Sequence, residues 1–474
     1  MKMLKCLSLV LLLGISSCSG GGSSSQDPSI DPSVAPSIEP SVSPSVEPSI
    51  EPSQEEPEID YELTYPSSLI TYEGEEYDTH YTYKYKDSYF DTNPVSYSKD
   101  LALFSFAFTI EATYKTNVRT FLTTLGFDRL VLSPDYDAPD SKDSVKFAIG
   151  HKEIHGTHVI AFASIGRDYQ LPWMNNFVIG ESGNAAGFAP YANRVANTVL
   201  EYARPYEGQN IKFFASGYSR GGGIVSLASH ILLKEHSDIA NSNNTYCYTF
   251  EAPTVVCDED YMEHPSIFSI YNSGDLISYL PPSKYGFRQL GVAIDLRRDD
   301  MDEVAVNFNE KTVLSPFVIT EDATNEEEFT AFTVEKFSKV ETRYESQGIY
   351  DISTRSNYVN HMQQYASYII GLFFSIKKAT KDDIVSNIMD NAFSLLVEDG
   401  LYNFLKEKLD AHGETYDDAL LRESCNYLVK FVMYICPDVV MYMLNDDYQS
   451  CIIRAAQLHA PEVILPLLLV TNPN

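Results

Sequence analysis

The sequence is short of basic residues and of cysteine. In 474 residues, 34 lysines and arginines stand against 66 aspartates and glutamates, a formal net charge of −32. That much negative charge repels nucleic-acid phosphates and anionic lipid headgroups, so it argues against either as a direct partner. The cysteines beyond Cys18 are odd in number and irregularly spaced: Cys247, Cys257, Cys425, Cys436 and Cys451. None of them forms a C-x-x-C pair, so the sequence predicts neither a disulfide framework nor a metal site.

After the first residues, the sequence has no apolar run long enough to predict a transmembrane helix. The runs near Ile369 and Ile464 are short and fit core helices better. Residues 1–18 have two lysines, an apolar stretch and a small-residue segment that ends in Cys18. This order is typical of an export signal. It resembles a bacterial lipoprotein signal, in which Cys18 is lipidated after cleavage; an ordinary signal cut nearby is the alternative. We therefore expect an exported cell-surface or periplasmic lipoprotein, anchored to a bacterial membrane through Cys18.

Residues 19–57 consist of a glycine–serine run followed by the repeats DPSI, DPSV, APSI and EPSV and their variants. Proline at every fourth position blocks helices and sheet ladders and favours extended polyproline conformations. Such a segment buries too little apolar surface to fold. We predict a disordered tether that holds the catalytic domain, residues 58–474, away from the membrane.

Beyond the tether, strand-like and helix-like apolar patterns alternate. Strands are predicted at 145–149, 158–164, 211–216, 245–252 and 267–271, and helices at 99–125, 187–203 and 221–235. Tyrosines 81, 83 and 85 alternate with polar residues, as in a half-buried strand. The alternation predicts an α/β fold, with a mostly parallel sheet covered by helices on both faces. A mainly helical pattern follows, which predicts a C-terminal insertion or cap at about residues 335–450.

The segment Gly217-Tyr218-Ser219-Arg220-Gly221 has the form G-x-S-x-G between a predicted strand and a predicted helix. A sharp turn in this context exposes the serine hydroxyl at a helix N-terminus, so Ser219 is the candidate nucleophile. Serine needs a histidine base and an acid. Asp275, just after the strand predicted at 267–271, is the preferred acid; a simple turn residue is the alternative, and Asp258 and Asp260 are weaker candidates.

Several segments together resemble bacterial class 3 lipases, a group of α/β hydrolases. They are GYSRGG, YTFEAP, NSGDLISYLPP and the earlier HVIAF, PWMNNF and GF, in order between residues 98 and 296. The resemblance implies an α/β-hydrolase fold and hydrolysis of carboxylic esters without a cofactor. The family usually has RGT where this chain has Ile165-Gly166-Arg167. The oxyanion hole is therefore expected from backbone N–H groups of Arg220 and of Gly166 or Arg167.

Two histidines are serious candidates for the base. His459 precedes Pro461, which can open a helix and so leaves the histidine on a loop. His361 lies beside an apolar stripe with helical spacing. Members of the family often end in an H-x-P-E-x-Y-like segment, which this chain matches at His459, Pro461 and Glu462 but not at Ile464, where the tyrosine would be. The resemblance therefore favours His459 and leaves His361 as the alternative base. His230 and the cluster of His151, His155 and His158 are weaker candidates, and that cluster lacks an acidic partner motif for a metal.

The sequence thus predicts an exported serine hydrolase that cleaves carboxylic esters, with lipids or other esters as substrates. Two alternatives stay open: a non-catalytic surface binding protein on the same fold, and an esterase of acylated polysaccharide. Apolar residues of the predicted helical region either line an acyl pocket or form that region's own core; they are Phe373, Phe374, Leu401 and Phe404.

Overall fold

The computed structural model describes residues 58–66, 78–139, 141–164, 171–275, 277–308, 350, 354–388, 394–435 and 457–471. Its centre is a seven-stranded sheet in the order β11-β9-β7-β6-β5-β4-β3. The strands are β3 (Asp128–Leu132), β4 (Phe147–Ile154), β5 (Thr157–Ser164), β6 (Ile211–Tyr218), β7 (Thr245–Phe250), β9 (Ile267–Tyr271) and β11 (Val292–Asp295). From β5 to β11 all neighbours are parallel, whereas β4 pairs antiparallel with both β5 and β3. The predicted α/β fold with a mostly parallel sheet is confirmed.

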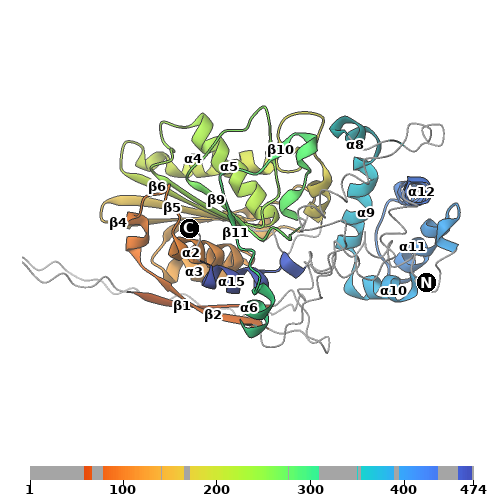
Figure 1. Cartoon of the computed structure of the whole chain (residues 1–474), viewed down its shortest axis with the longest axis horizontal. Helices are drawn as coiled ribbons and strands as arrows, with labels where there is room; N and C mark the ends of the chain where they lie inside the picture. The colour runs from red at the N-terminus through yellow and green to blue at the C-terminus, as the bar shows by residue number, and fades with distance from the viewer. Residues whose placement is uncertain are drawn as a thin grey trace, which may run out of the picture.

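Helices cover both faces of the sheet (Figure 1). On one face lie α4 (Ala189–Ala203) and α5 (Arg220–Glu235), and on the other lie α2 (Lys99–Glu111), α3 (Lys115–Thr124) and α15 (Pro461–Val470). Because both faces are covered, the central strands are apolar along their length rather than alternating, and seven of the eight residues of β5 are buried. Two hydrophobic cores result, one on each side of the sheet.

The helix predicted at 99–125 is instead two helices, since α2 ends at Glu111 and α3 begins at Lys115. Outside α2 lies an antiparallel pair of strands, β1 (Ile59–Pro66) and β2 (Asp78–Tyr85). The predicted alternation in β2 is confirmed, because Tyr83 and Tyr85 are buried and the polar residues between them are exposed. The ring of Tyr83 stacks on that of Phe104 in α2, with centroids 5.9 Å apart. The pair therefore adds an outer layer to the core beneath α2.

The remaining elements of this part are short. They are β8 (Val256–Cys257), which pairs with β10 (Phe287–Arg288), α6 (Met301–Phe308), and the 3-10 helices η1 (Asp87–Asp91), η2 (Pro134–Tyr136), η3 (Leu171–Phe177), η4 (Arg204–Tyr206), η5 (Ile277–Tyr279) and η6 (Ser283–Tyr285). We call the sheet, its covering helices and these short elements the sheet body. Helix α15 packs against α2 and α6, so the C-terminal helix belongs to this body.

A separate group of helices lies beside the sheet body (Figure 1). It comprises α8 (Arg355–His361), α9 (Gln363–Ser375), α10 (Lys378–Ile388), η8 (Ser394–Leu396), α11 (Gly400–Ala411) and α12 (Asp418–Ile435). We call it the helical region. Phe373, Leu401 and Phe404 lie in its own hydrophobic core, and the side chain of Phe374 is outside the described part of the chain. The described part of the predicted insertion is therefore mainly helical.

One arginine joins the helical region to the sheet body. The guanidinium of Arg355 donates hydrogen bonds to the backbone carbonyls of Ile179, Gly180 and Gly183 at 2.7–2.9 Å. It also lies over the ring of Phe287, 4.4 Å from the centroid. Three carbonyls and one aromatic face thus fix the start of α8 against the loop after η3.

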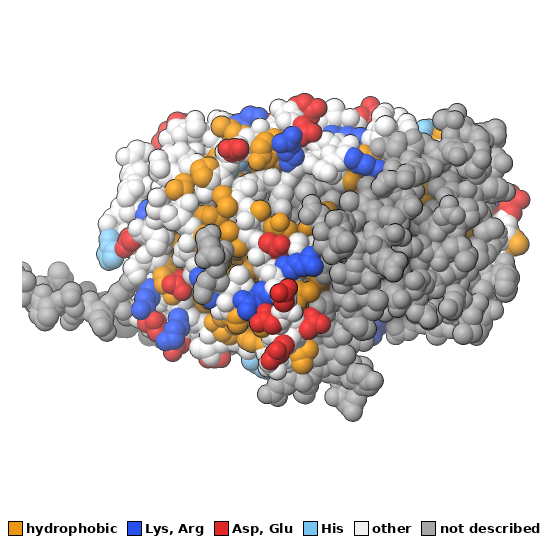
Figure 2. Space-filling view, in the orientation of Figure 1, with side chains coloured by type: hydrophobic (Ala, Val, Ile, Leu, Met, Phe, Trp, Pro, Cys, Tyr) orange, Lys and Arg blue, Asp and Glu red, His pale blue; other side chains and the backbone are white. Residues whose placement is uncertain are grey.

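The described surface mixes both signs of charge. Figure 2 shows acidic and basic side chains interspersed over the face of the sheet body, with hydrophobic side chains scattered between them. None of the helices in the described ranges is both long and apolar enough to span a bilayer. Cys247, Cys257 and Cys425 are buried and unbonded, while Cys436 and Cys451 are outside the described residues. The predicted signal, the tether and Cys18 also lie outside the described residues.

Candidate active site

Ser219 lies at the sharp turn between β6 and α5, as the G-x-S-x-G pattern predicts. Its φ of 54° and ψ of −127° are strained for a residue with a side chain. A Cβ at Gly217 would lie 2.5 Å from the carbonyl oxygen of Gly221, so only glycine fits there. The turn holds Ser219, 4% exposed, at the first turn of α5, where free backbone N–H groups favour a developing negative charge.

His459 lies between Ser219 and Asp275. Its Nε2 is 2.8 Å from Ser219 Oγ, and its Nδ1 is 2.6 Å from Asp275 Oδ2. Since a carboxylate accepts, Nδ1 carries the proton and Nε2 is left to accept from the serine hydroxyl. Pro461 is the first residue of α15, so His459 sits on the turn just before a helix, as the sequence predicts. The structure brings the three predicted side chains together in a buried hydrogen-bonded chain.

Asp275 follows β9, and its carboxylate is held from two sides. Oδ1 accepts from the backbone N–H of Ile277 at 3.0 Å, and the Ser278 hydroxyl lies 3.3 Å from Oδ2. The two weaker candidates bind elsewhere, because Asp258 pairs with Arg288 and Asp260 pairs with a lysine and a histidine on α5. Of these three aspartates, Asp275 is the one that contacts His459.

The other histidines have different partners. The ring of His361 stacks on that of Tyr350, with centroids 3.7 Å apart. His230 hydrogen-bonds His264 at 2.8 Å, and burial lowers the pKa of both imidazoles, that of His264 to about 4. His151 and His158 hydrogen-bond one another at 3.0 Å, while His155 occupies the turn between β4 and β5. Within the described ranges, His459 is thus the histidine that contacts Ser219.

Tyr218 restrains the candidate base. Its hydroxyl donates to the backbone carbonyl of His459 at 2.6 Å, and its ring meets the imidazole edge-on at 5.8 Å. The hydrogen bond spans 241 residues of chain, so no local pattern announces it.

Arg220 has a buried side chain as well as the expected backbone N–H. Its guanidinium donates to Asn176 Oδ1 at 2.6 Å and to the carbonyl of Gly187 at 3.1 Å, between the rings of Phe188 and Tyr191. It thereby fixes the segment after η3 against the serine turn. The other expected oxyanion donors, Gly166 and Arg167, lie outside the described residues.

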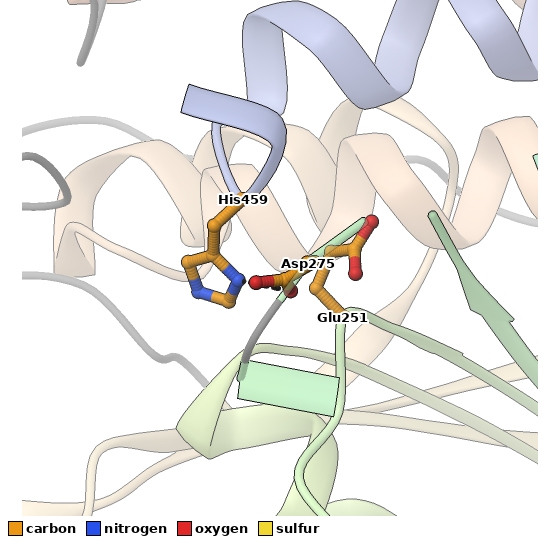
Figure 3. Close-up of side chains that lie close together, drawn as sticks. All are labelled: Glu251, Asp275 and His459. Carbon is orange, nitrogen blue, oxygen red and sulfur yellow. Dashed lines mark hydrogen bonds and ion pairs between the residues drawn. The ribbon is translucent and has the colours of Figure 1, made fainter. Parts of the chain in front are cut away.

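A second carboxyl, which the sequence reasoning missed, adjoins Asp275. Glu251 is fully buried just after β7, and Asp275 lies between its side chain and the imidazole of His459 (Figure 3). Glu251 Oε1 accepts from the backbone N–H of Asn272 at 2.9 Å, and Oε2 lies 2.9 Å from the Ser278 hydroxyl. Burial, and next the negative charge of Asp275, raise the pKa of Glu251 well above its usual value. The signal in the sequence is the glutamate in YTFEAP, at the end of a buried strand.

An apolar cavity of about 230 Å³ opens beside Ser219. Its apolar lining comes from both parts of the chain and includes Phe177, Ile179, Phe188, Leu280 and Tyr285 from the sheet body and Tyr358 from the helical region. Tyr358 also donates from its hydroxyl to the carbonyl of Phe177 at 3.0 Å. Of the two roles left open for Phe373, Leu401 and Phe404, the structure shows the second: they lie in the core of the helical region and do not line this cavity.

Comparison with known protein families finds a match in one segment of the chain. Residues 175–285 match the profile of the lipase (class 3) family, a span that holds Ser219, Glu251 and Asp275 but ends before His459. None of the curated protein sequences compared with the chain is a significant match.

Two solved structures are similar to part of this chain. Lipase II from Rhizopus niveus is 14% identical, with a TM-score of 0.28 over 40% of this chain and 78% of its own. The Lip2 lipase from Yarrowia lipolytica is 15% identical, with a TM-score of 0.26 over 37% of this chain and 68% of its own.

Proposed function

We propose that this protein is a serine hydrolase that cleaves carboxylic esters, with lipid esters as the substrate class. The observation that carries the proposal is the hydrogen-bonded chain from Ser219 through His459 to Asp275, buried beside an apolar cavity. Serine, imidazole and carboxylate in this order activate a hydroxyl for attack on an ester carbonyl. The match of residues 175–285 to class 3 lipases supports the same chemistry.

In the proposed mechanism, Ser219 Oγ attacks the ester carbonyl and its proton passes to His459 Nε2. Asp275 accepts the hydrogen bond from Nδ1–H, fixes the tautomer and stabilises the imidazolium that forms. The backbone N–H of Arg220, the first residue of α5, would donate a hydrogen bond to the oxyanion. We propose that the second donor is the backbone N–H of Gly166 or Arg167. His459 then returns the proton to the leaving alcohol, and water hydrolyses the acyl-enzyme by the same route.

The cavity supports an apolar acyl group rather than a sugar. A dry apolar cavity of about 150 Å³ accommodates a benzene molecule, and the cavity here is larger, at about 230 Å³. Each buried methylene contributes about 0.8 kcal/mol to binding. We therefore propose that the enzyme prefers esters whose acyl chain enters this cavity, with short acyl groups on polysaccharide as poorer substrates.

A fluorophosphonate probe tests the nucleophile directly. The wild-type chain is expected to take one label, at Ser219, and Ser219→Ala is expected to take none. An unlabelled wild-type chain, as a non-catalytic binding protein would be, or a labelled Ser219→Ala chain would contradict the proposal. Hydrolysis of short-chain, long-chain and sugar-linked esters, assayed side by side, then tests the substrate class.

We also propose that the protein is exported and held at a bacterial membrane by a lipid on Cys18. The proposal rests on the order of charges, apolar residues and cysteine in residues 1–18. Wild-type protein expressed in a bacterium is expected in the detergent phase of a Triton X-114 partition, and Cys18→Ser in the aqueous phase or in uncleaved form. An unchanged partition of Cys18→Ser would contradict lipidation.

A further inference from the structure

Two carboxyl groups share one buried site beside the imidazole. Asp275 is 1% exposed and Glu251 is fully buried, and one oxygen of each lies within 4.8 Å of the other and of a ring nitrogen of His459. In Figure 3, Asp275 separates the imidazole from Glu251. Burying two like charges this close is strongly unfavourable, so one of the two carboxyls holds a proton.

The hydrogen bonds identify which carboxyl is charged. The Ser278 hydroxyl is within reach of both carboxyls and does not distinguish them. Apart from it, Asp275 accepts from two donors, His459 Nδ1 at 2.6 Å and the N–H of Ile277 at 3.0 Å. Donors gathered on a carboxylate stabilise its ionised form. The backbone gives Glu251 one donor, the N–H of Asn272. Asp275 is therefore the anion, and the pKa of Glu251, raised by burial and by that anion, agrees with this assignment.

The Ser278 hydroxyl lies between the two carboxyls. Its oxygen is 2.9 Å from Glu251 Oε2 and 3.3 Å from Asp275 Oδ2. A hydroxyl has one proton to donate, but its lone pairs can also accept. If Glu251 carries a proton, both contacts are satisfied in sequence: Glu251 donates to Ser278, and Ser278 donates to Asp275.

We propose that Glu251 is a positioning residue that remains a neutral acid and, through Ser278, holds the Asp275 carboxylate in place for His459. The inference rests on the proposed function of the Ser219 site. A neutral Glu251 donates to Ser278, which in turn donates to Asp275, so the Asp275 carboxylate gains a hydrogen bond without a second negative charge nearby. The fixed carboxylate then holds the imidazole of His459 in its orientation.

A cation in place of the proton does not fit this geometry. Zinc lies about 2.0–2.2 Å from nitrogen and oxygen ligands in a tetrahedral arrangement, which places ligand atoms more than about 3 Å apart. His459 Nδ1 and Asp275 Oδ2 are 2.6 Å apart, the distance of a direct hydrogen bond. Stoichiometric metal in the purified active enzyme, lost together with activity on dialysis against a chelator, would overturn the proton assignment.

Glu251→Gln and Glu251→Leu separate the alternatives. Glutamine retains a neutral donor, so kcat is expected within about 3-fold of wild type and the acid limb of the kcat/KM profile is expected to stay in place. Leucine removes the donor and is expected to lower kcat about 10–100-fold with little change in KM. The substrate is p-nitrophenyl butyrate, and melting temperatures establish that each variant is folded.

Each outcome decides the inference. If Glu251 were ionised, Glu251→Gln would remove a negative charge near the imidazole and move the acid limb to lower pH, which would overturn the proposal. Wild-type kcat in folded Glu251→Leu would also overturn it. Ser278→Ala, as the matched control, is expected to lower kcat in the same direction and to add little to Glu251→Leu, since the two residues act in one chain.

An infrared measurement gives a readout besides activity. A buried protonated carboxyl has a C=O stretch distinct from that of a carboxylate, and the difference spectrum between wild type and Glu251→Gln is expected to contain this band. A wild-type chain that takes no fluorophosphonate but shows the band would sink the proposed function and retain the protonated glutamate. A labelled, active chain without the band would sink the inference alone.

Discussion

The sheet body and the helical region differ in what they bring to the site. Ser219, Asp275 and His459 all lie on the sheet body. His459 does so because it lies just before α15, the helix that packs on the body after the helical region. The helical region has a core of its own, packs on η3 of the sheet body through α9, and reaches the cavity with Tyr358. On the proposed function, the two parts divide the work: the body holds the reacting groups, and the helical region contributes to the wall of the substrate pocket.

The strongest test of that division compares two histidines. His459→Ala removes the proposed general base on the sheet body and is expected to lower kcat by about 10⁴-fold or more. His361→Ala, on the helical region, is the matched control and is expected to leave kcat near wild type, since its ring stacks on Tyr350. Steady-state ester hydrolysis measures both; the reverse pattern would transfer the base to the helical region.

The two parts are also expected to respond oppositely to pH. Glu111 on α2 is buried, which raises its pKa to about 7, so its contribution favours the folded state at low pH and is lost as pH rises from about 4.5 to 7. The folded state loses about 3 kcal/mol of stability through Glu111 by the time the pH is above 7. In the helical region, a hydrogen bond from His412 lowers the pKa of Asp383. The ionised Asp383 therefore stabilises the folded state, and this contribution is lost as the pH falls below about 4.

Glu111→Gln is expected to flatten the pH dependence of unfolding of the sheet body between about pH 4.5 and 7. The measurement is urea unfolding at a series of pH values. The exposed Glu153→Gln on β4 is the control and is expected to leave the profile unchanged. An unchanged profile for Glu111→Gln would show that Glu111 does not carry this dependence.

The pocket can be tested through Tyr358. Truncation to alanine removes an apolar wall and the hydrogen bond to Phe177, so we expect KM to rise about 5–20-fold for long acyl chains and less for acetate esters. Tyr365→Ala, whose ring stacks on Tyr427 within the helical region, is the control. Equal losses on long and short esters would mean that Tyr358 supports folding rather than acyl binding.

Tyr218→Phe is the mildest change and acts inside the sheet body. It deletes the hydrogen bond to the His459 carbonyl, which is expected to lower kcat about 5–10-fold while KM stays the same. Tyr246→Phe deletes phenol hydrogen bonds to the backbone carbonyls of Phe90 and Thr92, near the start of β7 rather than at the serine turn. It is expected to lower the melting temperature similarly without lowering kcat. If both variants lose only stability, Tyr218 does not position the base.

Local patterns predict the fold and the individual candidates well. The strand-before, helix-after setting of Ser219, the loop after β9 that carries Asp275 and the helix-opening Pro461 are all contained in short stretches. Patterns fail where a residue acts through distant partners. Glu251 comes close to Asp275 only because β7 and β9 are neighbours in the sheet. Tyr218 contacts His459 only because the segment before α15 packs on the sheet body.

Local patterns also failed to predict strand β3 and the break between α2 and α3. Strand β3 is exposed or half-exposed along its length, so it has neither the alternation nor the apolar run that marks a strand. The break between α2 and α3 falls in a stretch whose apolar residues continue at helical spacing. In both places tertiary packing, rather than local propensity, decides the structure.

The return of α15 to the sheet body has a consequence for the newly made chain. His459 is synthesised 240 residues after Ser219. At about 5–20 residues per second, the nucleophile leaves the ribosome roughly 10–50 s before its proton acceptor exists. On the proposed mechanism, an unfinished chain with a complete serine turn is therefore inert towards esters, and activity begins only after the last helix docks. The order of elements along the chain is itself a safeguard for the cell that makes the enzyme.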